Sequence, residues 1–142
     1  MKISSILTTK GDFVATVPPD ASVSELLALL AEHQIGAAVV SEDGRRVSGI
    51  VSERDVARAA HSHGSEALQR PVREIMTAVV VTCEPNATTA ELMGLMTERR
   101  VRHIPVIVDE EMIGIVSIGD IVKSRLAELE TERDALQAYI SS

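Results

Sequence analysis

The chain has 142 residues, a single cysteine and a formal net charge of −7 at pH 7. This length suits one compact domain, and a single cysteine excludes an internal disulfide framework. The negative charge argues against a nucleic-acid partner held through its phosphates, and aromatic residues are only 1% of the chain, so base-stacking platforms are almost absent. No apolar stretch approaches the ~20 residues of a membrane span, and residues 1–7 lack the apolar run of a signal peptide. We therefore expect a cytoplasmic protein with no nucleic-acid or membrane partner.

An internal repeat organises the sequence. Residues 19–27 are echoed from residue 85, an offset of 66, and residues 49–56 are echoed from residue 114, an offset of 65. A repeat of this period indicates two similar supersecondary units, each too small to bury its own apolar face. Their packing should be pseudo-twofold and should create two related clefts, which favours a binding module over an enzyme.

The first unit begins with a lead-in at residues 3–7, followed by a short strand expected at 13–17 and then by a helix. Ser22 and Glu25 predict a capping box at the start of that helix. Apolar side chains then recur at i, i+3, i+4 and i+7, which is one face of a helix: Val23, Leu26, Leu27 and Leu30.

Two strands come next in the first unit, at 36–40 and 47–51. The turn between them contains Asp43-Gly44, a dipeptide that favours a tight hairpin. A second helix should begin at Ser52, which gives the unit the order β-α-β-β-α. The polar residues 61–65 predict a loop that joins the two halves.

The second unit repeats this order. Its lead-in at 72–76 follows Pro71, which stands where the first residue of a helix would be. A strand is expected at 79–82, and Thr88 and Glu91 repeat the capping box. The remaining elements correspond in the same way: the helix face Thr89, Leu92, Met93 and Met96, the strands 104–108 and 112–116, and a second helix from Ser117.

The last helix continues beyond the repeat. Its apolar positions alternate by four and three, which makes an a/d seam of under three heptads with an arginine inside it. The seam consists of Val122, Leu126, Leu129, Arg133, Leu136 and Ile140. Two interpretations are open, a surface helix packed on its own domain or a contact in a homo-oligomer, and we favour the homo-oligomer.

The sharpest motif is Gly-Ile-Val-Ser-x-x-Asp, which ends at Asp55 in the first unit and at Asp120 in the second. Its glycine lets the strand approach a neighbour closely. Its Ser opens a helix, whose N-terminus offers unpaired amides and about half a positive charge to a phosphate. The Asp can accept hydrogen bonds from the two vicinal hydroxyls of a ribose, as in dinucleotide-binding folds. Ser-x-x-Asp is also a capping box that needs no ligand, so both interpretations stay open.

Basic residues accompany this motif on an otherwise acidic chain. Arg54 lies inside the first motif, and Arg99, Arg100, Arg102 and His103 lie just before an expected strand. The arginine fork suits phosphate, although cations are also favoured at the C-terminus of a helix. We assign Arg99 and Arg100 to the helix end, and Arg54 and His103 to a ligand.

No catalytic constellation stands out in the sequence. His61 and His63 lie two residues apart without a nearby cysteine or third histidine to complete a zinc set. Cys83 has no base nearby in the sequence, and no Walker-type loop or nucleophile elbow occurs. We therefore predict that the chain is not an enzyme, has no metal site and requires no cofactor.

Taken together, these features resemble the cystathionine-β-synthase (CBS) domain family, in which two tandem copies form a Bateman module. The resemblance rests on the β-α-β-β-α unit, on Pro-x-x-(Ser/Thr)-x-x-Glu-Leu at Pro19 and Pro85, on both Asp-ending motifs, and on residues 101–106, which resemble the family's second strand. It implies an α/β (α+β) fold of two CBS repeats with pseudo-twofold symmetry and a C-terminal helical extension. The expected boundaries are 1–60, a linker at 61–70, 71–124, and the extension at 125–142.

The resemblance also implies a function. It implies a regulatory module that binds an adenine nucleotide (AMP, ADP, ATP, or in some members NAD or S-adenosylmethionine), catalyses nothing, forms a homodimer and signals to a separate partner protein. Carried over by position, one set of residues would form a second nucleotide site, with Ser117 at phosphate and Asp120 at ribose: Thr77, Val79, Val101, Arg102, His103, Ser117 and Asp120. Another set would form the first site: Lys10, Ile35, Gly36, Ala37, Ser52, Arg54 and Asp55.

Two departures from the family pattern make the sites unequal. The first copy lacks the proline that stands at Pro105 in the second, and the second copy has Ile118-Gly119 where the first has Glu53-Arg54. The second site therefore lacks a phosphate-facing arginine, for which Arg102 or His103 is available. The alternative to nucleotide sensing is a purely structural dimerisation module with degenerate clefts.

Overall fold

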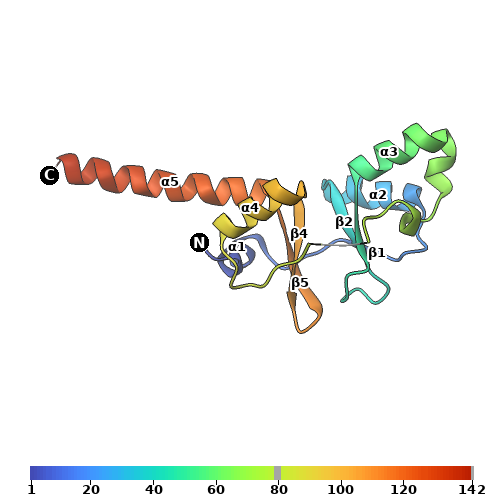
Figure 1. Cartoon of the computed structure of the whole chain (residues 1–142), viewed down its shortest axis with the longest axis horizontal. Coiled ribbons are helices and arrows are strands. Elements are labelled where there is room, and N and C mark those ends of the chain that lie inside the picture. Colours follow the sequence, from blue (N-terminus) through green and yellow to red (C-terminus); the bar gives the residue numbers. More distant parts are fainter. Residues whose placement is uncertain (79–80, 142) are drawn as a thin grey trace.

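The computed structural model describes residues 1–78 and 81–141. It has mixed α+β architecture, with two units side by side and a long C-terminal helix that projects away from the second unit (Figure 1). The α-helices are α1 (Ile3–Lys10), α2 (Val23–His33), α3 (Glu53–His63), α4 (Thr89–Arg99) and α5 (Ile118–Ser141), and two short 3-10 helices are η1 (Gly64–Gln69) and η2 (Val72–Glu74). The strands are β1 (Thr16–Val17), β2 (Ala37–Val40), β3 (Gly49–Ser52), β4 (His103–Val108) and β5 (Glu111–Ser117).

The first unit is a three-stranded sheet with the order β1-β2-β3, parallel between β1 and β2 and antiparallel between β2 and β3. All four residues of β2 are buried, as expected for a central strand. The capping box predicted for α2 is confirmed, because Ser22 Oγ accepts from the amide of Glu25 at 3.1 Å and Glu25 accepts from the amide of Ser22 at 3.4 Å. The expected strand at 13–17 is only two residues long, and Phe13 is 61% exposed.

The second unit is the antiparallel pair β4-β5, which pairs His103 with Ser117. The capping box of α4 at Thr88 and Glu91 is confirmed. Two details differ from the sequence prediction. Met93 is 40% exposed, and Leu95 packs on the core instead. Of the expected strand at 79–82, residues 79 and 80 lie outside the described residues and 81 and 82 are not in a strand.

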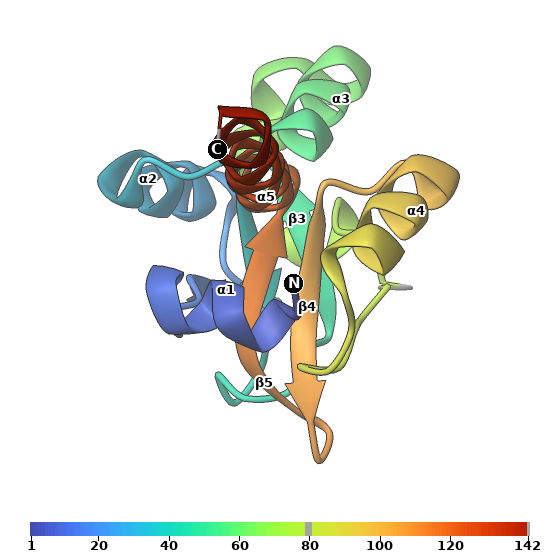
Figure 2. The same ribbon diagram turned by 90° about the vertical axis from the view of Figure 1, so that its left-hand side faces the viewer.

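Each lead-in packs on the other unit: residues 3–7 pack on the second unit, and residues 72–76 pack on the first. Ile3 and Ile6 of α1 are buried in the core of the second unit, and Figure 2 shows α1 against β5. Conversely, Val72 is buried in the core of the first unit. The motif glycines make this possible, as predicted. A Cβ on Gly49 would lie 2.7 Å from Met76 Sδ and 2.8 Å from Thr77 O, and a Cβ on Gly114 would lie 2.7 Å from Leu7 Cδ2.

The polar loop predicted at 61–65 is wrong. Helix α3 continues through His63, Gly64 ends it with a φ of +63°, and η1 follows directly. The polar side chains of 61–65 are exposed, whereas Ala59 and Ala67 on either side are buried. The segment is therefore a helix with one narrow buried face, and its two histidines suit the negative end of the helix dipole.

Helix α5 is packed only at its beginning. Of its residues only Ile121 and Ser124 are buried, and 129–141 are exposed, so its second half does not pack on its own domain. Its seam carries exposed apolar side chains, namely Val122, Leu126, Leu129, Leu136 and Ile140. In the described part of the chain, no helix is long and apolar enough to cross a membrane.

Candidate functional site

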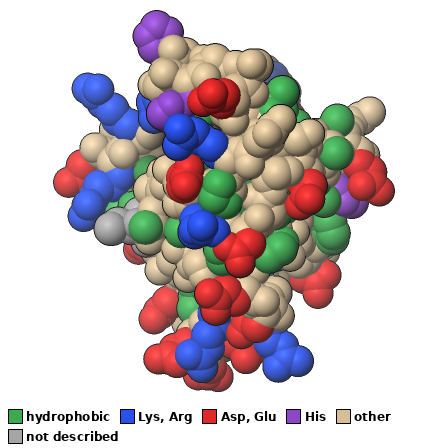
Figure 3. All heavy atoms as spheres, turned by 90° about the vertical axis from the view of Figure 1, so that its right-hand side faces the viewer, with side chains coloured by type: hydrophobic (Ala, Val, Ile, Leu, Met, Phe, Trp, Pro, Cys, Tyr) green, Lys and Arg blue, Asp and Glu red, His purple; other side chains and the backbone are tan. Residues whose placement is uncertain are grey.

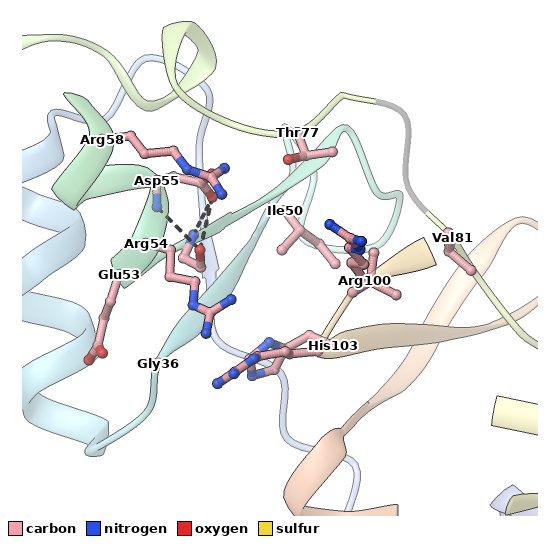
Figure 4. A pocket seen from close by; sticks show the side chains of 13 residues that line it. Gly36, Ile50, Glu53, Arg54, Asp55, Arg58, Thr77, Val81, Arg100 and His103 are labelled. Carbon is pink, nitrogen blue, oxygen red and sulfur yellow. Dashed lines mark hydrogen bonds between the residues drawn. The ribbon is translucent and has the colours of Figure 1, made fainter. Parts of the chain in front are cut away.

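A pocket of about 270 Å³ lies between the two units (Figure 4). The N-terminus of α3 forms one wall, and the segment before β4 forms the opposite wall. Its volume is near the lower end of the roughly 300–1,000 Å³ of small-molecule sites. The lining residues are Gly36, Ile50, Ser52, Glu53, Arg54, Asp55, Arg58, Thr77, Val81, Arg100, Val101, Arg102 and His103.

The first Ser-x-x-Asp motif forms the start of the α3 wall. Ser52 is the N-cap, and Asp55 Oδ2 accepts hydrogen bonds from the Ser52 amide at 2.8 Å and from its hydroxyl at 3.1 Å. The capping interpretation is therefore confirmed. The cap uses only Oδ2 of the Asp55 carboxylate, and Oδ1 accepts no hydrogen bond from the residues that the structure describes. A carboxylate offers about four acceptor positions, so the cap does not prevent Asp55 from accepting ligand hydroxyls as well.

Positive charge is concentrated around the pocket. Arg54 and Arg58 extend from α3, and Arg100 and Arg102 flank the start of β4, against the carboxylates of Glu53 and Asp55 on the same lining. Arg54 and His103 project into the pocket from opposite walls (Figure 4). By contrast, acidic and basic side chains are mixed across the face in Figure 3. A local cationic excess on a chain of charge −7 suits an anionic ligand.

The surroundings of His103 favour the neutral form of its imidazole. Burial lowers the pKa of its imidazole, and the positive charges of Lys10 and Arg102 lower it further, while the carboxylate of Asp120 acts in the opposite direction. A neutral imidazole has one donor and one acceptor nitrogen, so His103 can form hydrogen bonds of either kind with a ligand.

The second Ser-x-x-Asp motif lies outside this pocket. Asp120 Oδ2 accepts from the Ser117 amide at 2.8 Å and from its hydroxyl at 2.9 Å, as in the first motif. It also lies 2.6 Å from Lys10 Nζ, which donates in addition to the carbonyl of Ile115 at 2.8 Å. Burial acts to raise the pKa of Asp120, but the hydrogen bonds from Lys10 and Ser117 outweigh it and lower the pKa below its ordinary value.

The structure brings together candidate residues that the sequence analysis assigns to two different sites. Because each lead-in packs on the other unit, Thr77 exchanges two backbone hydrogen bonds with Ile50, at 2.8 and 3.0 Å, beside the first motif. The pocket therefore combines four of the seven residues of each expected site: Gly36, Ser52, Arg54 and Asp55 with Thr77, Val101, Arg102 and His103. Lys10, expected in the first site, lies with Ser117 and Asp120.

Three further candidate residues are not among the described lining of the pocket. Ile35 and Ala37 flank Gly36, and neither belongs to the lining; Ile35 is partly buried against the first core, and Ala37 is buried in β2. Val79 lies outside the described residues.

Sequence reasoning missed several lining residues, of which two arginines bear on charge. Arg58 follows Arg54 by four positions on one helix, so it shares the same face, and this spacing could have predicted it. Arg100 is the left-handed C-cap of α4, with a φ of 54°, so its assignment to the helix end is confirmed, but it also lines the pocket. The others are Ile50 and Glu53, which lie within the first motif, and Val81, which lies in the strand expected at 79–82.

The comparisons with known proteins agree with this architecture. The CBS domain model matches residues 3–62 and 72–127. The chain belongs to the CBS domain family. The crystal structure of the CBS-domain containing protein ATU1752 from Agrobacterium tumefaciens superimposes with a TM-score of 0.85 and 44% identity, covering 88% of this chain and 99% of that one. The predicted tandem CBS pair, its α+β class and its C-terminal helix are thus confirmed.

Two other CBS proteins are similar to this chain. The mitochondrial CBS domain-containing protein CBSX3 of Arabidopsis thaliana is 38% identical over 125 residues, 85% of this chain, and this chain spans 61% of that relative's length. The CBS domain protein PAE2072 from Pyrobaculum aerophilum, complexed with AMP, has a TM-score of 0.78 and 26% identity, covering 92% of this chain and 99% of that one.

Two features of the described residues concern nucleophiles and metal ligands. Burial raises the pKa of the Cys83 thiol to about 11, so the thiol is protonated at neutral pH and is a poor nucleophile. Within residues 1–78 and 81–141, no group of three or more His, Cys, Asp or Glu side chains could hold a metal ion. That the chain is not an enzyme stays a prediction.

Proposed function

We propose that this CBS pair is a regulatory module that binds an adenine nucleotide, AMP, ADP, ATP or NAD, in the pocket beside Asp55 and signals this to a partner protein. The observation that carries the proposal is the convergence, in one pocket between the units, of a helix N-terminus, a carboxylate with a free acceptor oxygen, and four arginines. The AMP complex of a relative with the same fold supports it.

The pocket offers a chemically distinct group for each part of a nucleotide. Ile50, Val81 and Val101 are the apolar lining residues, suited to a purine face. Asp55 would accept from the ribose hydroxyls, the chemistry that dinucleotide-binding folds use. Arg54 would pair with phosphate at the positive end of α3.

The position of the pocket suggests how binding would be transmitted. Its walls come from different units, so a ligand that contacts both favours one relative arrangement of them over another. Differential affinity for two arrangements is what a ligand-driven switch requires. In this proposal the chain works as a homodimer that presents the arrangement to an unidentified protein.

A melting experiment separates this proposal from the alternative, a structural dimerisation module with no ligand. AMP, ADP, ATP and NAD are each added at millimolar concentration, with inosine monophosphate as a matched purine control. A ligand at ~100 times its Kd adds about 2.7 kcal/mol to the free energy of unfolding, which raises the melting temperature by several degrees. If no adenine nucleotide raises it, the dimerisation module becomes the better account.

A further inference from the structure

The two Ser-x-x-Asp motifs have the same internal geometry and different surroundings. In both, one oxygen of the aspartate accepts from the serine amide at 2.8 Å and from the serine hydroxyl at about 3 Å. Around Asp55 lies the open pocket. Beside Asp120 lies the ammonium group of Lys10.

Lys10 is held at Asp120 by two contacts. Its Nζ donates to Asp120 Oδ2 at 2.6 Å and to the carbonyl oxygen of Ile115 at 2.8 Å. The side chains are 33% and 23% exposed, so both charges are partly withdrawn from water. An ion pair that is partly desolvated and has a second hydrogen bond is less readily broken than a pair on an open surface.

Among the residues that the structure describes, no cation is paired with the aspartate of the first motif. Within the described part of the chain, Asp55 has no ion pair. The lead-ins align through Leu7 and Met76, which lie against the two motif glycines. In this alignment the residue that corresponds to Lys10 is Val79, whose side chain has no hydrogen-bond donor. The carbonyl of Ile50 accepts from the amide of Thr77, whereas its counterpart at Ile115 accepts from Lys10.

We propose that Lys10 closes the second of the two expected clefts, the one at Asp120, so that the chain binds one nucleotide, at Asp55, and not two. The ammonium group donates to Asp120 Oδ2, the oxygen that also accepts from Ser117, and its charge lies against the carboxylate that ribose hydroxyls would contact. A nucleotide at this cleft would have to displace it. This inference rests on the proposed function. It differs from the expectation that Lys10 contacts a nucleotide base.

Binding stoichiometry tests the inference. We expect native mass spectrometry and calorimetric titration, with AMP and with ATP as probes, to give one nucleotide per wild-type chain. Lys10→Ala should raise this to two, and Lys10→Ala with Asp120→Ala should return it to one. Lys123→Ala is the matched control, because it removes a lysine three residues after Asp120 that has no ion pair with a described residue, and it should leave one. Lys10→Val, which copies the residue of the other lead-in, repeats the test should the alanine variant fold poorly.

The possible outcomes separate this inference from the proposed function. Two nucleotides on the wild-type chain, or one on both Lys10 variants, would overturn the closure by Lys10 and leave nucleotide binding intact. No binding to the wild type with one nucleotide on Lys10→Ala would overturn the pocket at Asp55 and keep the closure. No binding to either protein would overturn both.

Discussion

Asp55 combines a helix cap with the proposed ligand contact, because one carboxylate oxygen completes the capping box of α3 and the other accepts no hydrogen bond from a described residue. Asp55→Ala should therefore lower the free energy of unfolding by about 0.5–2 kcal/mol, as loss of a helix cap does. It should also weaken adenine-nucleotide binding at least tenfold, about 1.4 kcal/mol, by removing the acceptor for ribose. Denaturant unfolding and calorimetric binding on the same variant measure the two effects.

A matched control separates the cap from the ligand contact. Glu25 holds the equivalent position in the capping box of α2 and does not line the pocket. Glu25→Ala should lower stability with no change in affinity. If Asp55→Ala behaves like Glu25→Ala, then Asp55 is only a cap.

His103 gives the protein a pH dependence of known sign. Its pKa in the folded state is lowered by burial and by Lys10 and Arg102, against Asp120, from an ordinary value of 6.5. The unfolded chain therefore binds a proton more readily, and the free energy of unfolding should fall as pH drops below about 6.5. Urea unfolding at pH 7.5 and 5.5 should show this decrease, and His103→Gln should show less of it. His63→Gln, at an exposed side chain, should keep the full decrease, and an equal decrease in all three proteins would contradict the assignment.

At the scale of elements, the predictable features were those with a local cause. Ser22 and Thr88 each satisfy an amide three residues away, so both capping boxes could be identified from the sequence. The sequence could not reveal that each lead-in packs on the other unit, because the apolar pattern of residues 3–7 and of residues 72–76 suits either core equally well. Lys10 was therefore placed in the wrong neighbourhood, beside Asp55 rather than Asp120. The polarity of residues 61–65 is also compatible with an exposed helix, which is why α3 can continue through His63 where the sequence predicts a loop.

The motif glycines predict unequal sensitivity of β3 and β5 to substitution. A Cβ at Gly49 would meet the carbonyl of Thr77 at 2.8 Å, a backbone atom that cannot move aside alone. A Cβ at Gly114 would meet the flexible end of Leu7 at 2.7 Å. Gly49→Ala should therefore lower the free energy of unfolding by about 1–3 kcal/mol, and Gly114→Ala by less.

Chemical unfolding of both glycine variants measures this difference. Gly94→Ala is the control, because its Cβ meets nothing within 4 Å inside α4, and it should stabilise by about 0.5–1 kcal/mol. Equal losses for Gly49→Ala and Gly114→Ala would mean that the Thr77 segment is as yielding as a leucine side chain. Gly49→Ala should also weaken nucleotide binding, because Thr77 lines the pocket.

At the scale of the whole molecule, α5 is the largest feature that the two CBS units leave uncovered (Figure 1). Leu126 is 55% exposed and Leu136 is 62% exposed, on a seam with the a/d spacing of a coiled coil. Exposed apolar residues gathered on one face usually mark an interaction site, and twofold assemblies are the commonest closed form. Because Arg133 interrupts the seam, the helix should contribute to a homodimer in which the CBS units supply most of the contact.

Removal of residues 125–142 should therefore weaken the homodimer without unfolding the CBS pair. Ile121 and Ser124, the two buried residues of α5, both remain in the shortened chain, so its core is intact. Sedimentation velocity across a micromolar concentration series should show a higher dimer dissociation constant for the shortened chain, with an unchanged melting transition for the monomeric unit. Leu129→Glu should reproduce the loss by placing a charge in the seam, whereas Glu130→Gln, beside it on the helix, should not. A full-length chain that sediments as a monomer at micromolar concentration would show that the seam does not serve a second copy.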